Sequence, residues 1–242
     1  MDQPTHVVVV DFDNTLISNS LHYRVEESGI LRKDLHAELF GLRNQNLARL
    51  DELTDEESYN WAATAIEAYV NSGLSMEDIE KVLEGVKLKE GVVEFIDFLG
   101  ESNIPLAIIS SGIDDFIRII LRKHSLSFSI NEVFATKLIT DFNDFGRSYG
   151  RIRGFNSGSV VTPGNKRDFS LYFSEIFQVH RDSILAIGDS SFDRNLGHLK
   201  RNRLGVAETQ GKAERIAPFF GEVIVTDHFV SVQEWVMRKI LQ

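Results

Sequence analysis

The sequence contains no cysteine among its 242 residues, so disulfide bonds, thiolate zinc sites and thiol redox chemistry are excluded. It also lacks a long apolar run, because the valines near the N-terminus stop at Asp11, far short of the roughly 20 residues of a membrane-spanning helix. The N-terminus shows no basic segment followed by a long apolar core. We therefore expect a cytoplasmic protein that is neither secreted nor bound to a membrane.

Basic residues are the minority among the charged ones, with 26 Lys and Arg against 36 Asp and Glu, and the formal net charge is -10. This balance argues against binding nucleic acid or anionic lipid through a general basic surface. Length and composition are typical of one large globular domain, or of one domain with a smaller insert. An anionic ligand would need local positive charge from a metal ion, a lysine or helix N-termini.

Three apolar runs predict strands that are buried on both faces, because their side chains do not alternate with polar ones. These runs are residues 7–10, 104–109 and 183–188. Shorter strands are expected at 134–139, 159–161, 204–207 and 223–225, a hairpin or irregular loop at 141–158, and helices at about 91–100, 113–121, 166–177 and 230–241. Alternating strands and helices predict an α/β fold with a doubly wound parallel sheet and right-handed crossovers.

Helical spacing replaces this alternation between the first and second buried strands. A capping-box pattern begins at Thr54 and a second helix start at Ser75, and apolar residues then recur at helical spacing. We therefore divide the chain into a core, residues 1–17 and 88–242, and an inserted helical domain, residues 18–87.

Polar residues stand where each buried strand should end. In chain order they are Asp11 and Asp13, then Ser110, Ser111 and Gly112, then Asp189 with Asp193 four residues later. In open α/β sheets, ligands bind in the crevice beyond the carboxyl ends of the strands. Lys166, at the start of a predicted helix, adds a positive charge. Together these groups form a candidate site for phosphoryl transfer to a carboxylate.

Each group also has a structural explanation, which the sequence leaves open. Asp11 and Asp13 fit a turn after a strand. Asp189 and Asp193 fit the first turn of a helix, where acidic residues are favoured. Lys166 fits a solvated helix start, and Ser110 and Ser111 fit a helix cap.

The motifs resemble those of the haloacid dehalogenase-like superfamily, most of whose members are magnesium-dependent phosphatases. Its four motifs are matched, in order, by Asp11-x-Asp13-x-Thr15, by Ser110, by Lys166, and by Gly188-Asp189 with Asp193. The helical insert is similar to the superfamily's cap domain. The layout is most like the phosphoserine phosphatase branch and somewhat like its pyrimidine-nucleotidase relatives.

The resemblance implies a role for each matching residue. Asp11 would attack phosphorus as the nucleophile, and Asp13 would be the general acid and base. Mg²⁺ would be held by the carboxylates of Asp11 and Asp189 and the backbone carbonyl of Asp13. The phosphoryl group would be bound by Ser110, Ser111, Gly112 and Lys166. Asp193 and Thr15 would support these groups from behind, Asp193 by orienting Lys166 or a metal-bound water.

Cap residues depart from the phosphoserine phosphatase pattern. Ser20 stands near the place of an acidic residue that reads the substrate amine, so phosphoserine is not the predicted substrate. The cap arginines Arg24, Arg43 and Arg49 are each expected on a solvated face.

The sequence therefore predicts a Mg²⁺-dependent phosphomonoesterase. It would act on a small phosphorylated metabolite through an aspartyl-phosphate intermediate, with no nucleic-acid or membrane partner. The alternatives are a phosphotransferase or nucleotidase of the same fold, and a non-catalytic phosphate-binding or signalling protein. The sequence favours no particular oligomeric state.

Overall fold

A computed structural model describes residues 3–141 and 150–241 of the chain. Its main sheet has six strands in the order β3-β2-β1-β6-β7-β8, and each neighbouring pair runs parallel. The strands are β1 (Val7–Val10), β2 (Leu106–Ile113), β3 (Glu132–Thr136), β6 (Ile184–Gly188), β7 (Arg203–Ala207) and β8 (Glu222–Val225). The predicted doubly wound parallel sheet is confirmed.

The strand order reverses direction between β1 and β6. From β1 the chain adds β2 and β3 on one side, and it later returns to add β6, β7 and β8 on the other side. The carboxyl ends of β1 and β6 are therefore neighbours, and the ladder between them extends to Asp11, whose N–H donates to the Ile187 carbonyl at 2.9 Å. Such a reversal creates the crevice in which open α/β sheets bind ligands.

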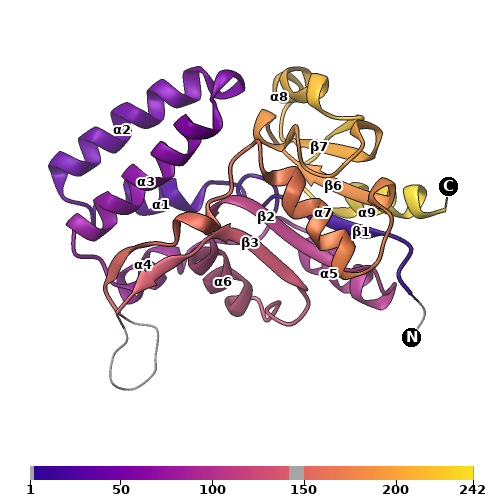
Figure 1. Cartoon of the computed structure of the whole chain (residues 1–242), viewed down its shortest axis with the longest axis horizontal. Coiled ribbons are helices and arrows are strands. Elements are labelled where there is room, and N and C mark those ends of the chain that lie inside the picture. The colour runs from indigo at the N-terminus through magenta and orange to yellow at the C-terminus, as the bar shows by residue number, and fades with distance from the viewer. Residues whose placement is uncertain (1–2, 142–149, 242) are drawn as a thin grey trace.

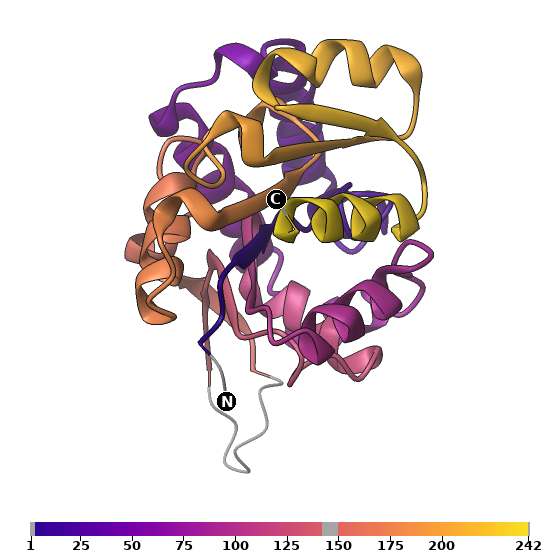
Figure 2. The same cartoon turned by 90° about the vertical axis from the view of Figure 1, so that its right-hand side faces the viewer.

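The β1 strand is buried on both faces, as its uninterrupted valines predict. Val8 and Val10 pack in the same core cluster as α5 (Val92–Glu101), α6 (Asp114–Lys123) and α9 (Val230–Ile240). Val7 and Val9 pack in a second cluster with Phe173 of α7 (Lys166–Ile176). Helices α5 and α9 thus lie on the opposite side of the sheet from α7 (Figure 2).

The segment between β1 and α5 is helical. It contains α1 (Leu21–Glu27), α2 (Lys33–Ala48), α3 (Asp55–Asn71) and α4 (Met76–Leu83). The expected capping box forms between Thr54 and Glu57 before α3, and the structure shows a second one between Ser75 and Asp78 before α4. Figure 1 shows α2 and α3 side by side, beyond the ends of the strands. None of the helices in the described ranges is both long and apolar enough to cross a membrane.

The two connections between this helical segment and the sheet lie against each other. Ile17 and Leu88 form an antiparallel bridge, and the N–H of Lys89 donates to the Leu16 carbonyl at 2.8 Å. The proposed domain boundaries, 17/18 and 87/88, fall on this bridge. Paired connections of this kind suit a hinge between two bodies, and the division into core and cap remains our proposal.

One strand prediction was wrong. Residues 157–159 form a 3₁₀ turn, in which the Asn156 side chain accepts a hydrogen bond from the N–H of Gly158, and residues 160 and 161 belong to no strand. Val161 is buried because it packs in the second core cluster, and it does so without pairing with a strand. The expected strand 134–139 is divided between β3 and β4 (Leu138–Thr140), and β4 pairs antiparallel with β5 (Ile152–Phe155). The remainder of the expected hairpin, 142–149, lies outside the described residues.

Candidate active site

A buried lysine joins two of the predicted acidic residues. The Lys166 Nζ lies 2.8 Å from Asp11 Oδ1 and 2.6 Å from Asp193 Oδ1. All three side chains are buried, and they come from the end of β1, the start of α7 and the turn after β6. The interpretation of Lys166 as a solvated helix-start residue is therefore excluded by its burial. Strand ends far apart in the sequence meet around one ammonium group.

The turn after β6 depends on a glycine. Asp193 Oδ2 accepts hydrogen bonds from the backbone N–H groups of Asp189 at 2.9 Å and of Ser190 at 3.2 Å. A Cβ on Gly188 would lie 2.4 Å from Asp193 Cγ, so only glycine allows this turn to close. Asp193 thus caps the turn with Oδ2 and binds Lys166 with Oδ1. This geometry is compatible both with an acidic residue that caps a turn and with the predicted role of Asp193 in orienting Lys166.

Asp13 faces the cap. Its Oδ1 accepts from the N–H of Leu21 and its Oδ2 from the Ser20 hydroxyl, both at 3.1 Å. Asp13 is half-buried, and a Cβ on Gly112 would lie 3.4 Å from its Oδ2. The second aspartate therefore lies beside the candidate phosphate loop, and Ser20 serves as a donor to it rather than as a charged group.

The candidate phosphate loop is the irregular end of β2. The predicted strand end came too early, because β2 continues through Ser110, Ser111 and Gly112 to Ile113, with a shift in its pairing register over these residues. The N–H of Gly112 donates to the Ser110 hydroxyl at 3.1 Å. The Ser111 hydroxyl is buried and has no hydrogen-bond partner among the described residues. This loop presents a free hydroxyl at the strand end.

Three buried carboxylates form a group that fits a metal ion. Oxygens of Asp11, Asp189 and Asp193 lie within 4.8 Å of one another, the one such cluster among the described residues. The Asp13 carboxylate is not in this cluster, which leaves the predicted metal contact to its backbone carbonyl. Hard cations such as Mg²⁺ prefer oxygen ligands of this kind. Thr15 Oγ1 donates to Asp189 Oδ1 at 3.3 Å, which places the threonine behind the site as predicted.

Burial shifts the pKa values of these groups. It raises the pKa of Asp11 well above its usual range, an effect that Lys166 opposes and that Asp193 and Asp189 reinforce. Burial also raises the pKa of Asp189 and raises that of Asp13 to about 6. Burial alone would lower the pKa of Lys166, but Asp11 and Asp193 more than offset it, and the net shift is upward. Crowded acids of this kind favour a bound cation, which keeps them ionised.

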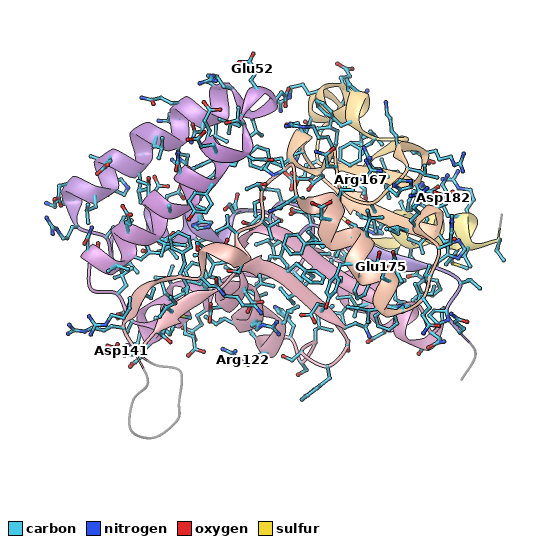
Figure 3. All side chains as sticks on the ribbon, in the orientation of Figure 1. Glu52, Arg122, Asp141, Arg167, Glu175 and Asp182 are labelled. Atoms are coloured by element: carbon cyan, nitrogen blue, oxygen red, sulfur yellow. The ribbon has the colours of Figure 1, made fainter. Side chains whose placement is uncertain are left out.

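A cavity of about 550 Å³ lies between these residues and the helical segment. Its core side includes Asp11, Asp13, Lys166 and the Ser110–Gly112 loop, and its cap side is lined by α1, α2 and α3. The volume is typical of a pocket for a small molecule. Glu52 is part of the lining, and Figure 3 shows it at the end of the cap nearest to the core.

A sequence model of the family described as pyrimidine 5′-nucleotidase (UMPH-1) matches residues 13–239. The chain belongs to this family. The match confirms the predicted resemblance to haloacid dehalogenase-like phosphatases, and the family is one of phosphomonoesterases by its description.

A relative in Mus musculus, named 7-methylguanosine phosphate-specific 5′-nucleotidase, is 28% identical over 163 residues, which are 64% of this chain and 52% of that protein. The chain spans about half the length of the 7-methylguanosine nucleotidases that it matches.

Two solved structures share the fold. A substrate-bound phosphoserine phosphatase gives a TM-score of 0.69 at 16% identity, covering 97% of this chain and 100% of that one. Cytosolic 5′-nucleotidase IIIB bound to cytidine gives 0.68 at 19% identity, covering 98% and 85%. The chain therefore shares its fold with these two proteins, in agreement with the predicted resemblance to the phosphoserine phosphatase branch and its nucleotidase relatives.

Several residues of the site carried no sequence signal. Lys212, in α8 (Gln210–Ile216), places its Nζ 2.6 Å from Asp189 Oδ2 and lines the cavity. The Lys89 Nζ lies 2.6 Å from the Asn14 carbonyl and so ties down the turn after β1. Neither lysine belongs to a motif. The expectation that Arg43 is solvated was wrong, because its side chain is only 11% exposed and binds Glu26.

Proposed function

We propose that this chain is a Mg²⁺-dependent phosphomonoesterase that hydrolyses a nucleoside monophosphate through an aspartyl-phosphate intermediate. The observation that carries the proposal is the Lys166 ammonium, held between Asp11 and Asp193 at the floor of the cavity. A cation fixed on one oxygen of a carboxylate leaves the other oxygen to attack phosphorus. It also offsets the charge that develops during phosphoryl transfer.

In the first step Asp11 forms a bond to phosphorus as the bond from phosphorus to the leaving oxygen breaks. Ser110, the free Ser111 hydroxyl and the Gly112 backbone supply donors for the phosphoryl oxygens. Asp13 gives its proton to the leaving oxygen. A carboxyl with a pKa of about 6 retains enough of its protonated form near neutral pH to act as this acid.

In the second step Asp13, now ionised, accepts a proton from a water molecule that attacks phosphorus. The bond between phosphorus and Asp11 breaks, and inorganic phosphate leaves. The hydrogen bonds from Ser20 and the N–H of Leu21 hold the Asp13 carboxylate in position for both transfers. Because these donors belong to the start of the cap, cap position and proton transfer are linked.

Mg²⁺ would be held by Asp11, Asp189 and the Asp13 carbonyl. When bound it supplies positive charge that offsets the repulsion between Asp11 and the phosphate dianion. The buried carboxylates of Asp11 and Asp189, whose oxygens lie within 4.8 Å of each other, support their part in this assignment.

A nucleotide is favoured over a small amino-acid phosphate. The cavity holds more than a phosphoserine would fill, and its cap side carries the aromatic side chains of Tyr23, Trp61 and Tyr69. Ser20 offers no charge to an amine. The names of the family and of the mouse relative point to nucleoside monophosphates as well. A cytoplasmic location, suggested by the absence of cysteine, remains part of the proposal.

The test is phosphate release from nucleoside monophosphates, phosphoserine and p-nitrophenyl phosphate, with Mg²⁺ or with chelator. We expect wild-type turnover with Mg²⁺ only, and a loss of about 10⁴-fold or more for Asp11→Asn. Asp168→Asn, at an exposed position of α7, is the matched control and should retain full activity. Turnover that persists in Asp11→Asn, or none from any ester in the wild type, would overturn the proposal.

A further inference from the structure

The turn after β1 is held by a buried lysine that belongs to none of the four motifs. Lys89 lies just after the Ile17–Leu88 bridge, where the chain returns from the helical segment to the core. Its side chain is 2% exposed. Its Nζ donates to the Asn14 carbonyl at 2.6 Å and lies 3.2 Å from Glu208 Oε1. A buried ammonium group is costly unless its partners compensate, so a lysine at this position calls for an explanation.

The carbonyl groups of this turn are used unequally. The Phe12 carbonyl accepts hydrogen bonds from three of the backbone N–H groups that follow it, at 2.9 to 3.4 Å. The Asn14 carbonyl accepts from Lys89. The Asp13 carbonyl, which lies between them in the chain, accepts no hydrogen bond from residues 3–141 or 150–241. The one carbonyl left over is therefore the one that we assign to the metal ion.

The backbone of Asn14 depends on contacts from outside the turn. Its φ of 58° lies in the left-handed region, which is unfavourable for residues other than glycine and is tolerated by asparagine. Lys89 binds the Asn14 carbonyl with its side chain, and its own N–H donates to the Leu16 carbonyl at 2.8 Å. One residue thus fixes the turn at two points on either side of Thr15.

The ammonium group has two effects on a metal ion, and they have opposite signs. By holding the turn it fixes the direction of the Asp13 carbonyl, which favours binding. By its charge it repels a cation, and this charge reaches the site: burial raises the pKa of Asp189, and Lys89 is among the groups that oppose this shift. Removal of Lys89 therefore weakens metal binding if the first effect dominates and strengthens it if the second does.

We propose that Lys89 is a positioning residue for the metal site, which holds the Asn14 peptide so that the neighbouring Asp13 carbonyl is free to bind a divalent cation. This proposal rests on the proposed function, since the metal site is part of it. Lys89 does not line the cavity, so it acts through the turn and not on the substrate. Lys87, an exposed lysine of the same connection, has no such role.

The experiment measures the binding of Mn²⁺, which prefers the same oxygen ligands as Mg²⁺, to metal-stripped protein by the electron paramagnetic resonance signal of the free ion. Asp189→Asn defines which part of the binding belongs to the site. We expect Lys89→Met to weaken this binding by about tenfold or more, the usual effect of removing a group that orients a metal ligand. Lys87→Met, the matched control, should keep the wild-type affinity to within about twofold.

A second variant separates geometry from charge. Lys89→Gln keeps an N–H donor but removes the charge, so it should weaken binding less than Lys89→Met does. Urea unfolding of each variant confirms that it is folded under the conditions of the binding measurement. If Lys89→Met does not fold, Lys89→Gln still decides, because a lysine that acts by its charge alone predicts tighter binding in that variant than in the wild type.

Unchanged or tighter binding in folded Lys89→Met would overturn the proposal, since the lysine would then only support the fold or act by its charge. Wild-type protein without an Asp189-dependent Mn²⁺ site would overturn it as well. Turnover is a separate question. If the wild type binds Mn²⁺ at this site but releases no phosphate, the proposed function is rejected, while the comparison of affinities still decides the role of Lys89.

Discussion

Buried charges are paired differently on the two sides of the cavity. We call the side formed by the core residues Asp11, Asp189 and Lys166 the floor, and the side formed by α1, α2 and α3 the cap wall. On the floor, Lys166 binds Asp11 and Asp193, and Lys212 binds Asp189, so the charged groups satisfy one another. On the cap wall, Glu26 is bound on one oxygen and unsatisfied on the other. The charged groups of the floor thus satisfy one another without a ligand, whereas the cap wall contains a buried carboxylate oxygen that has no partner among the described residues.

Hydroxyl groups follow a different pattern from charges. Ser111 on the floor and Ser58 on the cap wall both lack a hydrogen-bond partner in the described parts of the chain. A hydroxyl without a partner costs much less than a buried charge without one. Both ends of the cavity therefore leave neutral donors free, but only the cap leaves a charged acceptor free.

The largest expected effect on stability comes from removing the Lys166 ammonium group from the floor. Lys166→Met leaves Asp11 and Asp193 without their cation, and removing one partner of a buried ion pair typically costs about 3–5 kcal/mol. Asp11, whose pKa burial already raises, then takes up a proton more readily in the folded protein, so the loss of stability should be greater at pH 8 than at pH 5.5. Urea unfolding at the two pH values measures this difference.

The matched control for that change is Lys81→Met, since Lys81 is 67% exposed and pairs with Glu77. An exposed pair contributes about 0–1 kcal/mol, and the control should show no pH dependence of its effect. Equal losses for the two variants would mean that the floor is not held together by its charges.

A smaller effect is expected at Asp13, between floor and cap. Its pKa is raised from 3.8 to about 6, chiefly by burial, so the folded protein binds this proton more tightly than the unfolded chain. The stability that Asp13 contributes is present at low pH and is lost as pH rises to about 6. Asp13→Asn should therefore be more stable than wild type above pH 6, by about 1–2 kcal/mol for a half-buried group, and the difference should vanish near pH 4. Unfolding curves of both proteins, recorded without metal between pH 4 and 8, provide the measurement. A difference in the free energy of unfolding that stays constant over this range would contradict the prediction.

The smallest effect is expected on the cap wall. Ser58→Ala removes a buried hydroxyl that has no described partner, so the free energy of unfolding should change by about 0.5 kcal/mol or less. Ser20→Ala, the comparison variant, removes a hydroxyl that donates to Asp13 and should cost about 1 kcal/mol. Thermal unfolding of both variants distinguishes a hydroxyl without a partner from one that donates a hydrogen bond. A larger loss of stability for Ser58→Ala than for Ser20→Ala would contradict the assignment.

The strands that carry the site were predictable because their signals are local. Four consecutive valines indicate a strand buried on both faces, and β1 is such a strand. Thr54 and Ser75 begin helices because each satisfies nearby backbone N–H groups. The same local reasoning failed at residues 159–161, where buried valines suggested a strand but pack against the sheet as an irregular segment. Apolarity indicates burial, and it does not by itself indicate pairing.

The sequence alone determined the parallel sheet, the helical insert and the order of the four motifs, because periodicity, capping residues and strand-end polar groups act over a few residues. Only the tertiary structure decided which acids face the cavity. Glu26 and Glu27 are adjacent and chemically identical, yet Glu26 is buried beside the cavity and the Glu27 side chain is 63% exposed. That difference depends on how α1 packs against Arg43 of α2 and on the walls of the cavity, which are contacts between distant segments. The same holds for Lys212, whose charge matters because the fold brings α8 to the end of β6.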